Sequence, residues 1–352
     1  MPITLPANEW LAVLRKEYLR GFIPSGGAAV KFVVPMDGLD HQWLLEKMKQ
    51  DAEGNGYLFV SLDAATTRLH LIDRVFHAIA KQVAWDDLAY TFLCATLAEH
   101  QYRLPENRKD FGLAQLASLN SLDLGEMRRI VNSRLRDRLF KDYAMTQEFR
   151  IAMLRLCQAQ LDPEDIDAGI AEAVKEWLRG ELRLISALKS ALIFQKIGRH
   201  NGRHMLYSLS HWLHVTGRAG LVIVLDISRF LEGKRPLVAL SSWRGGVGVE
   251  LDISRFLEDR PPYYSKPAVI DGYEVLREFI DGTDELKFCL IVVVAPPSFL
   301  SDDQRGLTLY DALYFRISDD VHDRQRPNPL SSLVRLSGVE ATVNLPAPGG
   351  PP

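Results

Sequence analysis

GLVIVLD, residues 220–226, is a run of five consecutive apolar residues after a glycine, and it ends in an aspartate. Three more runs rich in β-branched residues occur at residues 29–34, 57–62 and 288–294. Apolar side chains at successive rather than alternate positions are typical of strands buried on both faces of a parallel sheet. The four runs therefore predict a parallel sheet at the centre of the protein.

Helical patterns lie between these runs. Residues 39–53 and 67–83 repeat apolar side chains at helical spacing, and residues 265–282 carry the clearest helix signals. In that third segment Ser265 is a suitable N-cap, Pro267 falls in the first turn and Gly282 closes the C-terminus. The alternation of strands and helices predicts an α/β fold.

The middle of the chain has a different character. Residues 84–215 contain no convincing strand pattern, and we expect a helical insertion there. This divides the α/β core into a first part, residues 1–83, and a second part, residues 216–345. The Pro/Gly-rich residues 346–352 are expected to form a disordered tail.

Composition narrows the class of protein. The 352 residues carry a net charge of −3 and three widely separated cysteines, which excludes a disulfide framework and a chain that is basic overall. The longest apolar run, residues 288–297, is far shorter than a membrane span. No basic segment followed by an apolar one begins the chain, so we expect a cytoplasmic protein without membrane association.

Five stretches together suggest a family. They are GGAAVKFVV (26–34), GLVIVLD (220–226), YEVLREFID (273–281), LIVVVAPPSFL (290–300) and RGLTLYDALYFRI (305–317). In order and spacing they resemble the ATP-binding proteins of BREX-type bacteriophage-defence systems, over most of residues 10–336. The resemblance implies a P-loop NTPase core of the AAA/ASCE type, with a parallel sheet and a large helical insertion.

The residues that would bind nucleotide depart from the P-loop pattern. A working loop follows the first strand as Gly-x-x-x-x-Gly-Lys-Ser/Thr, because backbone N–H groups and the lysine hold phosphates while the hydroxyl binds Mg²⁺. Residues 35–42 read PMDGLDHQ instead, with His41 at the lysine position and Gln42 at the hydroxyl position. Only Gly38 suits the family pattern, and Asp40 adds negative charge where phosphate would lie.

The acidic strand is also incomplete. Asp226 stands where the family's Mg²⁺-binding carboxylate belongs, but Ile227 replaces the glutamate that would orient water. We assign Asp226 from the first of two identical octapeptides, LDISRFLE at residues 225–232 and 251–258, because only the first follows a buried strand. The sequence thus predicts a vestigial nucleotide site of Gly38, His41, Gln42 and Asp226, with no catalytic residue and no bound cofactor. We also expect the strand at residues 29–34 to lie beside the strand that ends at Asp226.

A basic run lies in the expected insertion. Its arginines, which are candidates for contact with DNA phosphates, are Arg128, Arg129, Arg134, Arg136 and Arg138. A solvated helix face is the alternative interpretation of the same residues. No metal site is expected, because no cysteine or carboxylate completes the histidines of residues 200–214.

The leading functional hypothesis is a catalytically degenerate P-loop ATPase-like subunit, acting as a scaffold or regulator in a bacterial anti-phage defence system. Its partners, as the resemblance implies, would be an active ATPase, a PglZ-type protein, a methyltransferase or a helicase. One alternative is a divergent active ATPase that uses ATP and Mg²⁺, with a lysine supplied from elsewhere such as Lys31. The other is a DNA-binding adaptor that uses the basic insertion.

Overall fold

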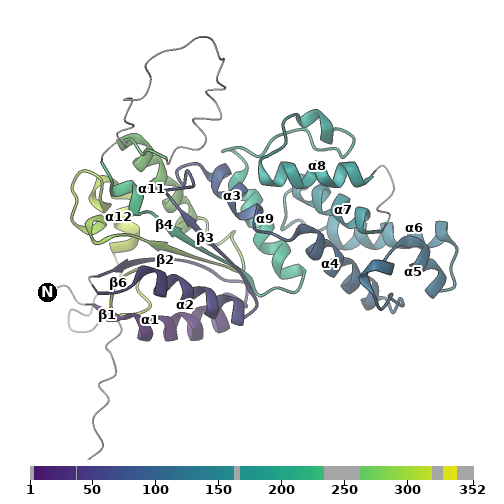
Figure 1. Ribbon diagram of the computed structural model, residues 1–352, viewed down its shortest axis with the longest axis horizontal. Helices are drawn as coiled ribbons and strands as arrows, with labels where there is room; N and C mark the ends of the chain where they lie inside the picture. Colours follow the sequence, from purple (N-terminus) through teal and green to yellow (C-terminus); the bar gives the residue numbers. More distant parts are fainter. Residues whose placement is uncertain (1–3, 37, 162–166, 234–261, 319–327, 339–352) are drawn as a thin grey trace, which may run out of the picture.

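The computed structural model describes residues 4–36, 38–161, 167–233, 262–318 and 328–338. At its centre is a six-stranded sheet in which every strand pair is parallel (Figure 1). The strands are β1 (Leu5–Pro6), β2 (Ala28–Pro35), β3 (Tyr57–Asp63), β4 (Gly220–Asp226), β5 (Cys289–Val294) and β6 (Leu333–Ser337). The predicted α/β class with a parallel sheet is therefore confirmed, and the four predicted strands correspond to β2 to β5.

The strand order is β1-β6-β2-β5-β4-β3, which corrects one expectation. We expected β2 to lie beside β4, and this is wrong, because β5 pairs with both and separates them. All six residues of β5 are buried, as a strand inside the sheet and covered on both faces requires.

Helices cover both faces of the sheet. On one face lie α1 (Ala7–Val13), its continuation η1 (Leu14–Phe22) and α2 (His41–Gly54), which share a core with Val33, Val224 and Val292 of the strands. The opposite face is covered mainly by α3 (Ile72–Ala80), α9 (Gly202–Val215), α11 (Lys266–Asp281) and α12 (Asp311–Ser318). The result is a three-layer α/β/α core (Figure 1).

All the regular secondary structure described between α3 and α9 is helical. It contains α4 (Trp85–Glu99), α5 (Leu113–Leu119), α6 (Leu124–Leu135), η3 (Arg136–Phe140), α7 (Gln147–Leu161), α8 (Asp167–Arg179) and η4 (Ile185–Leu188). Figure 1 shows α4 to α8 extending away from the sheet beyond α3 and α9. One continuous hydrophobic cluster joins this region to the sheet, and Trp212 of α9 packs on Phe92 of α4 with ring centroids 4.8 Å apart.

Local signals fixed the helix ends well. Ser265 caps α11 by accepting a hydrogen bond from the Ala268 amide, and Gly282 follows its last turn, as predicted. None of the described helices is long and apolar enough to span a bilayer. Three sequence features lie outside the described residues: Asp37, the second LDISRFLE copy and the predicted tail at residues 346–352.

Candidate functional site

The candidate site lies at the carboxyl ends of the strands, where ligands bind in open parallel sheets. β4 ends at Asp226, and β2 leads into α2 through residues 36–40. His41, the first residue of α2, places its Nε2 atom 3.2 Å from Oδ2 of Asp226. The structure therefore brings the residue at the lysine position into contact with the residue at the Mg²⁺ position.

Asp226 is committed to contacts within the chain. Its side chain is 15% exposed, and Oδ1 accepts a hydrogen bond of 2.8 Å from the Ser228 amide. Its backbone carbonyl accepts from the Ala64 amide, which ties the end of β4 to the segment after β3. The next residue, Ile227, is fully buried and offers no polar group to a water molecule.

The N-terminus of α2 already holds a negative charge. Asp40 is its N-cap, and the carboxylate accepts a 2.9 Å hydrogen bond from the Gln42 amide. The amides at a helix N-terminus are the groups that a phosphate would need. One of them is satisfied by the protein itself, and the side chain of Gln42 is exposed at the surface.

Gly38 lies on the other side of the loop, against β6. Its φ is +89°, in the left-handed region that favours glycine, and its carbonyl oxygen would lie 2.8 Å from a Cβ placed on Gly338. The Met36 amide donates to the Leu336 carbonyl, which fixes the loop to β6. Of the predicted site residues in this loop, only His41 contacts the end of β4.

Lys31 does not supply the missing lysine from its observed position. It is buried in the middle of β2, and its Nζ atom donates to the carbonyls of Leu330 and Ser331. The ammonium also lies 4.9 Å from the centroid of the Tyr18 ring. These contacts hold it under the sheet rather than at the carboxyl edge.

Two residues at this edge were missed by sequence reasoning. Asp63 ends β3 directly opposite Asp226 in the pairing register; it is exposed, and Oδ1 accepts from the Ala65 amide. The available signal was that two apolar runs both end in Leu-Asp. The role of Gly338 had no local signal, because it depends on the approach of the distant loop at Gly38.

The candidate DNA-binding arginines differ in their surroundings. Arg138 forms an ion pair of 2.8 Å with Glu99 and lies over the Phe92 ring, and Arg129 donates to the Gly125 carbonyl. Arg128 also interacts within the protein. Arg134 and Arg136 form no hydrogen bond or ion pair with their side chains among the described residues.

Two other polar features bear on the predicted sites. Within the described chain, no group of three or more His, Cys, Asp or Glu side chains is placed to hold a metal ion. Instead, His211 Nε2 lies 2.8 Å from Asp142 Oδ2, and His214 stacks on the Phe288 ring. Arg316 donates a hydrogen bond of 2.9 Å to Asp281, so its charge is paired within the chain.

Comparison with known proteins bears on the second half of the core. Residues 268–344 match the family model of the BREX system ATP-binding protein BrxC/D. The resemblance to the BREX ATP-binding family is confirmed over this stretch. The matched stretch includes β5 and β6, the two strands that flank β2, but none of Gly38, His41, Gln42 and Asp226. Searches of curated proteins and of solved structures each gave no match.

Proposed function

We propose that this chain is a P-loop ATPase-like subunit of a BREX anti-phage system whose nucleotide site has become structural. One observation carries the proposal: His41 and Asp226 contact each other at 3.2 Å, at the place where a lysine and a Mg²⁺-binding carboxylate would face a bound triphosphate. The family match supports the role in a BREX system. The contact supports the loss of turnover.

The side chains at this edge do not suit Mg²⁺-ATP. A triphosphate requires cationic and N–H donors, yet Asp40 is the first charged group at the helix terminus and already accepts from the Gln42 amide. Hydrogen bonds to charged groups contribute about 1.5–3 kcal/mol each, so the loss of the lysine and the hydroxyl removes a large part of the affinity. Among the described residues, this site therefore lacks the P-loop groups that ATP hydrolysis requires.

As a non-hydrolysing subunit, the protein would act as a scaffold or regulator in the bacterial cytoplasm. The resemblance suggests the partners: an active ATPase, a PglZ-type protein, a methyltransferase or a helicase of the same system. The parallel sheet and its covering helices provide a rigid core for such contacts, because they are held by buried apolar residues on both faces.

Nucleotide titration of the purified full chain tests the proposal. We expect no saturable heat on adding Mg²⁺-ATP in a calorimeter and no phosphate release above background. Phosphate release that persists through stringent purification and disappears in Asp226→Asn would overturn the proposal. The matched control is Asp63→Asn, which removes the neighbouring carboxylate without affecting the contact with His41.

A divergent active ATPase is the second candidate, and Asp63 is the observation that favours it. This exposed carboxylate lies beside Asp226 and could orient a water in place of the glutamate that Ile227 replaces. In that case Asp63→Asn would abolish turnover while leaving nucleotide binding intact. Turnover by the wild type that is lost in Asp63→Asn, with nucleotide binding retained, would therefore favour this second candidate over the first.

A further inference from the structure

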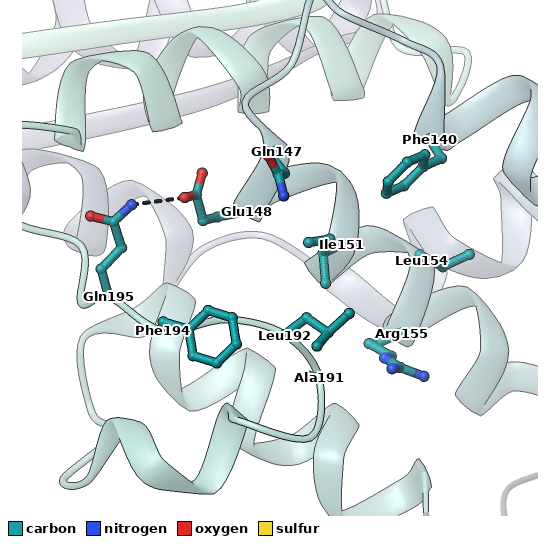
Figure 2. Close-up of a pocket in the computed structure, with 10 residues that line it drawn as sticks. All are labelled: Phe140, Gln147, Glu148, Ile151, Leu154, Arg155, Ala191, Leu192, Phe194 and Gln195. Carbon is teal, nitrogen blue, oxygen red and sulfur yellow. Dashed lines mark hydrogen bonds between the residues drawn. The ribbon is translucent and has the colours of Figure 1, made fainter.

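A pocket of about 580 Å³ opens on the helical region, between α7 and the segment that follows η4. Its floor is apolar and buried, formed by Ile151 and Ala191. Its rim consists of Phe140, Leu192 and Phe194, which are 42%, 59% and 64% exposed (Figure 2). Large apolar side chains that line a hollow and remain exposed mark a binding surface.

The backbone holds this rim in an uncommon shape. Leu192 has a φ of +63°, in the left-handed region that residues with a Cβ rarely adopt. Its amide donates to the Lys189 carbonyl, and the next amide, of Ile193, donates to the Leu188 carbonyl. This tight turn keeps Leu192 directed outward while Ile193 is fully buried. Strain of this kind is concentrated at sites where it serves binding.

The Phe140 ring packs against the guanidinium of a buried arginine. The guanidinium of Arg150 lies 5.5 Å from the centroid of Phe140 and 4.9 Å from that of Tyr143. Arg150 is buried and also donates to the Phe140 carbonyl. The rim ring is thereby oriented before any ligand arrives, which lowers the entropic cost of stacking on it.

Charge is distributed unevenly along the pocket. Glu148 lies at one end, where it accepts a 2.7 Å hydrogen bond from Gln195, and Arg155 lies at the other (Figure 2). Arg155 donates to the Ser190 carbonyl, but its buried Nε has no partner in the described structure. An anion therefore suits the Arg155 end and not the Glu148 end.

The cationic side continues past Phe140. Arg136 lies four residues before Phe140 in η3, about one helical turn away, and Arg134 lies in the last turn of α6. Both side chains form no ion pair within the described ranges, whereas the nearby Lys141 is paired with Asp137 at 2.7 Å. The pocket residue Phe140 is thus preceded in the sequence by two arginines that form no ion pair among the described residues, although the Lys141 hydrogen bond and, to a smaller extent, their charges lower the pKa of the exposed Asp137 carboxyl.

We propose that this pocket and its bordering arginines bind single-stranded nucleic acid. Unpaired bases stack separately against Phe140 and against Phe194, which lie on opposite sides of the pocket (Figure 2). The adjoining phosphates lie against Arg155, Arg136 and Arg134. Aromatic platforms beside a cationic groove are how proteins hold single strands, because every base has a flat face and every linkage a charge. The bases of an intact duplex are stacked on each other and cannot enter. This site is separate from the sheet edge and does not depend on the proposed function.

Fluorescence anisotropy tests the proposal. It measures how tightly the full chain binds labelled oligothymidylate, oligouridylate and a duplex at several salt concentrations. We expect both single strands to bind more tightly than the duplex. The affinity for oligothymidylate relative to oligouridylate shows whether deoxyribose or ribose is preferred. The double variant Phe140→Ala/Phe194→Ala should weaken binding roughly ten-fold or more, with the salt slope unchanged. Arg134→Ala/Arg136→Ala should reduce the slope of log affinity against log salt by about two.

The controls separate the site from general effects. Tyr314→Ala/Phe315→Ala removes two exposed aromatic rings on α12, outside the pocket, and should leave affinity unchanged. If the alanine variant of the rim fails to fold, Phe140→Leu/Phe194→Leu keeps the apolar cover and removes only the flat rings. Single-strand affinity that is unaffected by the leucine variant would overturn the proposal. Absence of binding by the wild type would also overturn it and assign the pocket to an apolar protein segment.

Discussion

The carboxyl edge of the sheet and the pocket beside α7 differ in how their polar groups are satisfied. At the sheet edge Asp40, His41 and Asp226 all find partners within the chain. Around the pocket, Arg134 and Arg136 have no ion pair among the described residues, and the rim rings are exposed. Polar groups that pair internally no longer need a ligand, whereas cations that form no ion pair, beside exposed rings, retain binding capacity. The polar groups of the sheet edge are therefore satisfied without a ligand, whereas the pocket region presents exposed rings and cations to solvent.

The largest expected effect concerns whether the two regions fold together. Trp212 is fully buried and packs on Phe92, which joins α9 to α4 within a single hydrophobic cluster. Trp212→Ala should lower the free energy of unfolding by about 3–5 kcal/mol, because it leaves a large cavity. Urea unfolding followed by circular dichroism and by intrinsic fluorescence should remain a single coincident transition.

Two separate transitions in the wild type would break this comparison, since the regions would then be independent units rather than one cooperative structure. The matched control is Leu184→Ala, a large apolar residue of the same region that is 70% exposed. Its effect on stability should stay within about 0.5 kcal/mol.

The sequence carried much of the fold because buried parallel strands have a strong local signal. The runs at β2 to β5 are nearly continuous in Val, Ile and Leu, and their elements were predicted within a few residues. β1 has only two residues, and β6 alternates partly buried and buried positions around Arg335, so neither gave such a run. The order of strands was misjudged because pairing is decided by tertiary packing, which no local pattern records.

The site was predictable in identity but not in geometry. Position in the loop and strand picked out His41 and Asp226, yet nothing local indicated that they would contact each other. Asp63 was missed because a terminal aspartate on an edge strand is an ordinary surface residue until the register places it opposite Asp226. The pocket was missed because it is assembled from Phe140, α7 and the turn at Leu192, which are distant in sequence.

An intermediate loss of stability is expected at the sheet edge, where the polar groups bind one another. Asp226→Ala should lower the free energy of unfolding by about 1–3 kcal/mol, because the Ser228 amide and the His41 ring each lose their partner. Thermal unfolding with and without Mg²⁺-ATP measures the loss of stability and any effect of the nucleotide. ATP should shift the midpoint of neither the wild type nor the variant.

A smaller loss is expected for Asp63→Ala, whose side chain is exposed and caps only a turn. Equal stability of Asp226→Ala and wild type, together with an ATP-dependent shift of the wild type alone, would mean that Asp226 still serves a ligand.

The smallest expected effect is a pH-dependent change in stability at Glu274, in the stretch that matches the BREX family model. Glu274 accepts hydrogen bonds from Arg277 and Tyr310, and these contacts lower its pKa from 4.5 to about 2. Asp281, one turn after Arg277 in α11, pairs with both Arg277 and Arg316. Arg277 and Arg316 are therefore paired with carboxylates within the protein, whereas Arg134 and Arg136 form no ion pair among the described residues.

A carboxylate whose pKa is lower in the folded state stabilises the protein at pH values above its unfolded pKa, and this contribution disappears as the pH falls through the folded pKa. For Glu274 the loss should occur between about pH 4.5 and pH 2. Because its side chain is 38% exposed, solvent screening reduces the contribution to about 1 kcal/mol. Urea unfolding across this range should therefore show that Glu274→Gln loses less stability on acidification than the wild type. Glu285→Gln, an exposed position with no ion pair in the described structure, should follow the wild-type curve. If Glu274→Gln also followed that curve, Arg277 would be as available to an external anion as Arg134 and Arg136, and the contrast between the core and the pocket would fail.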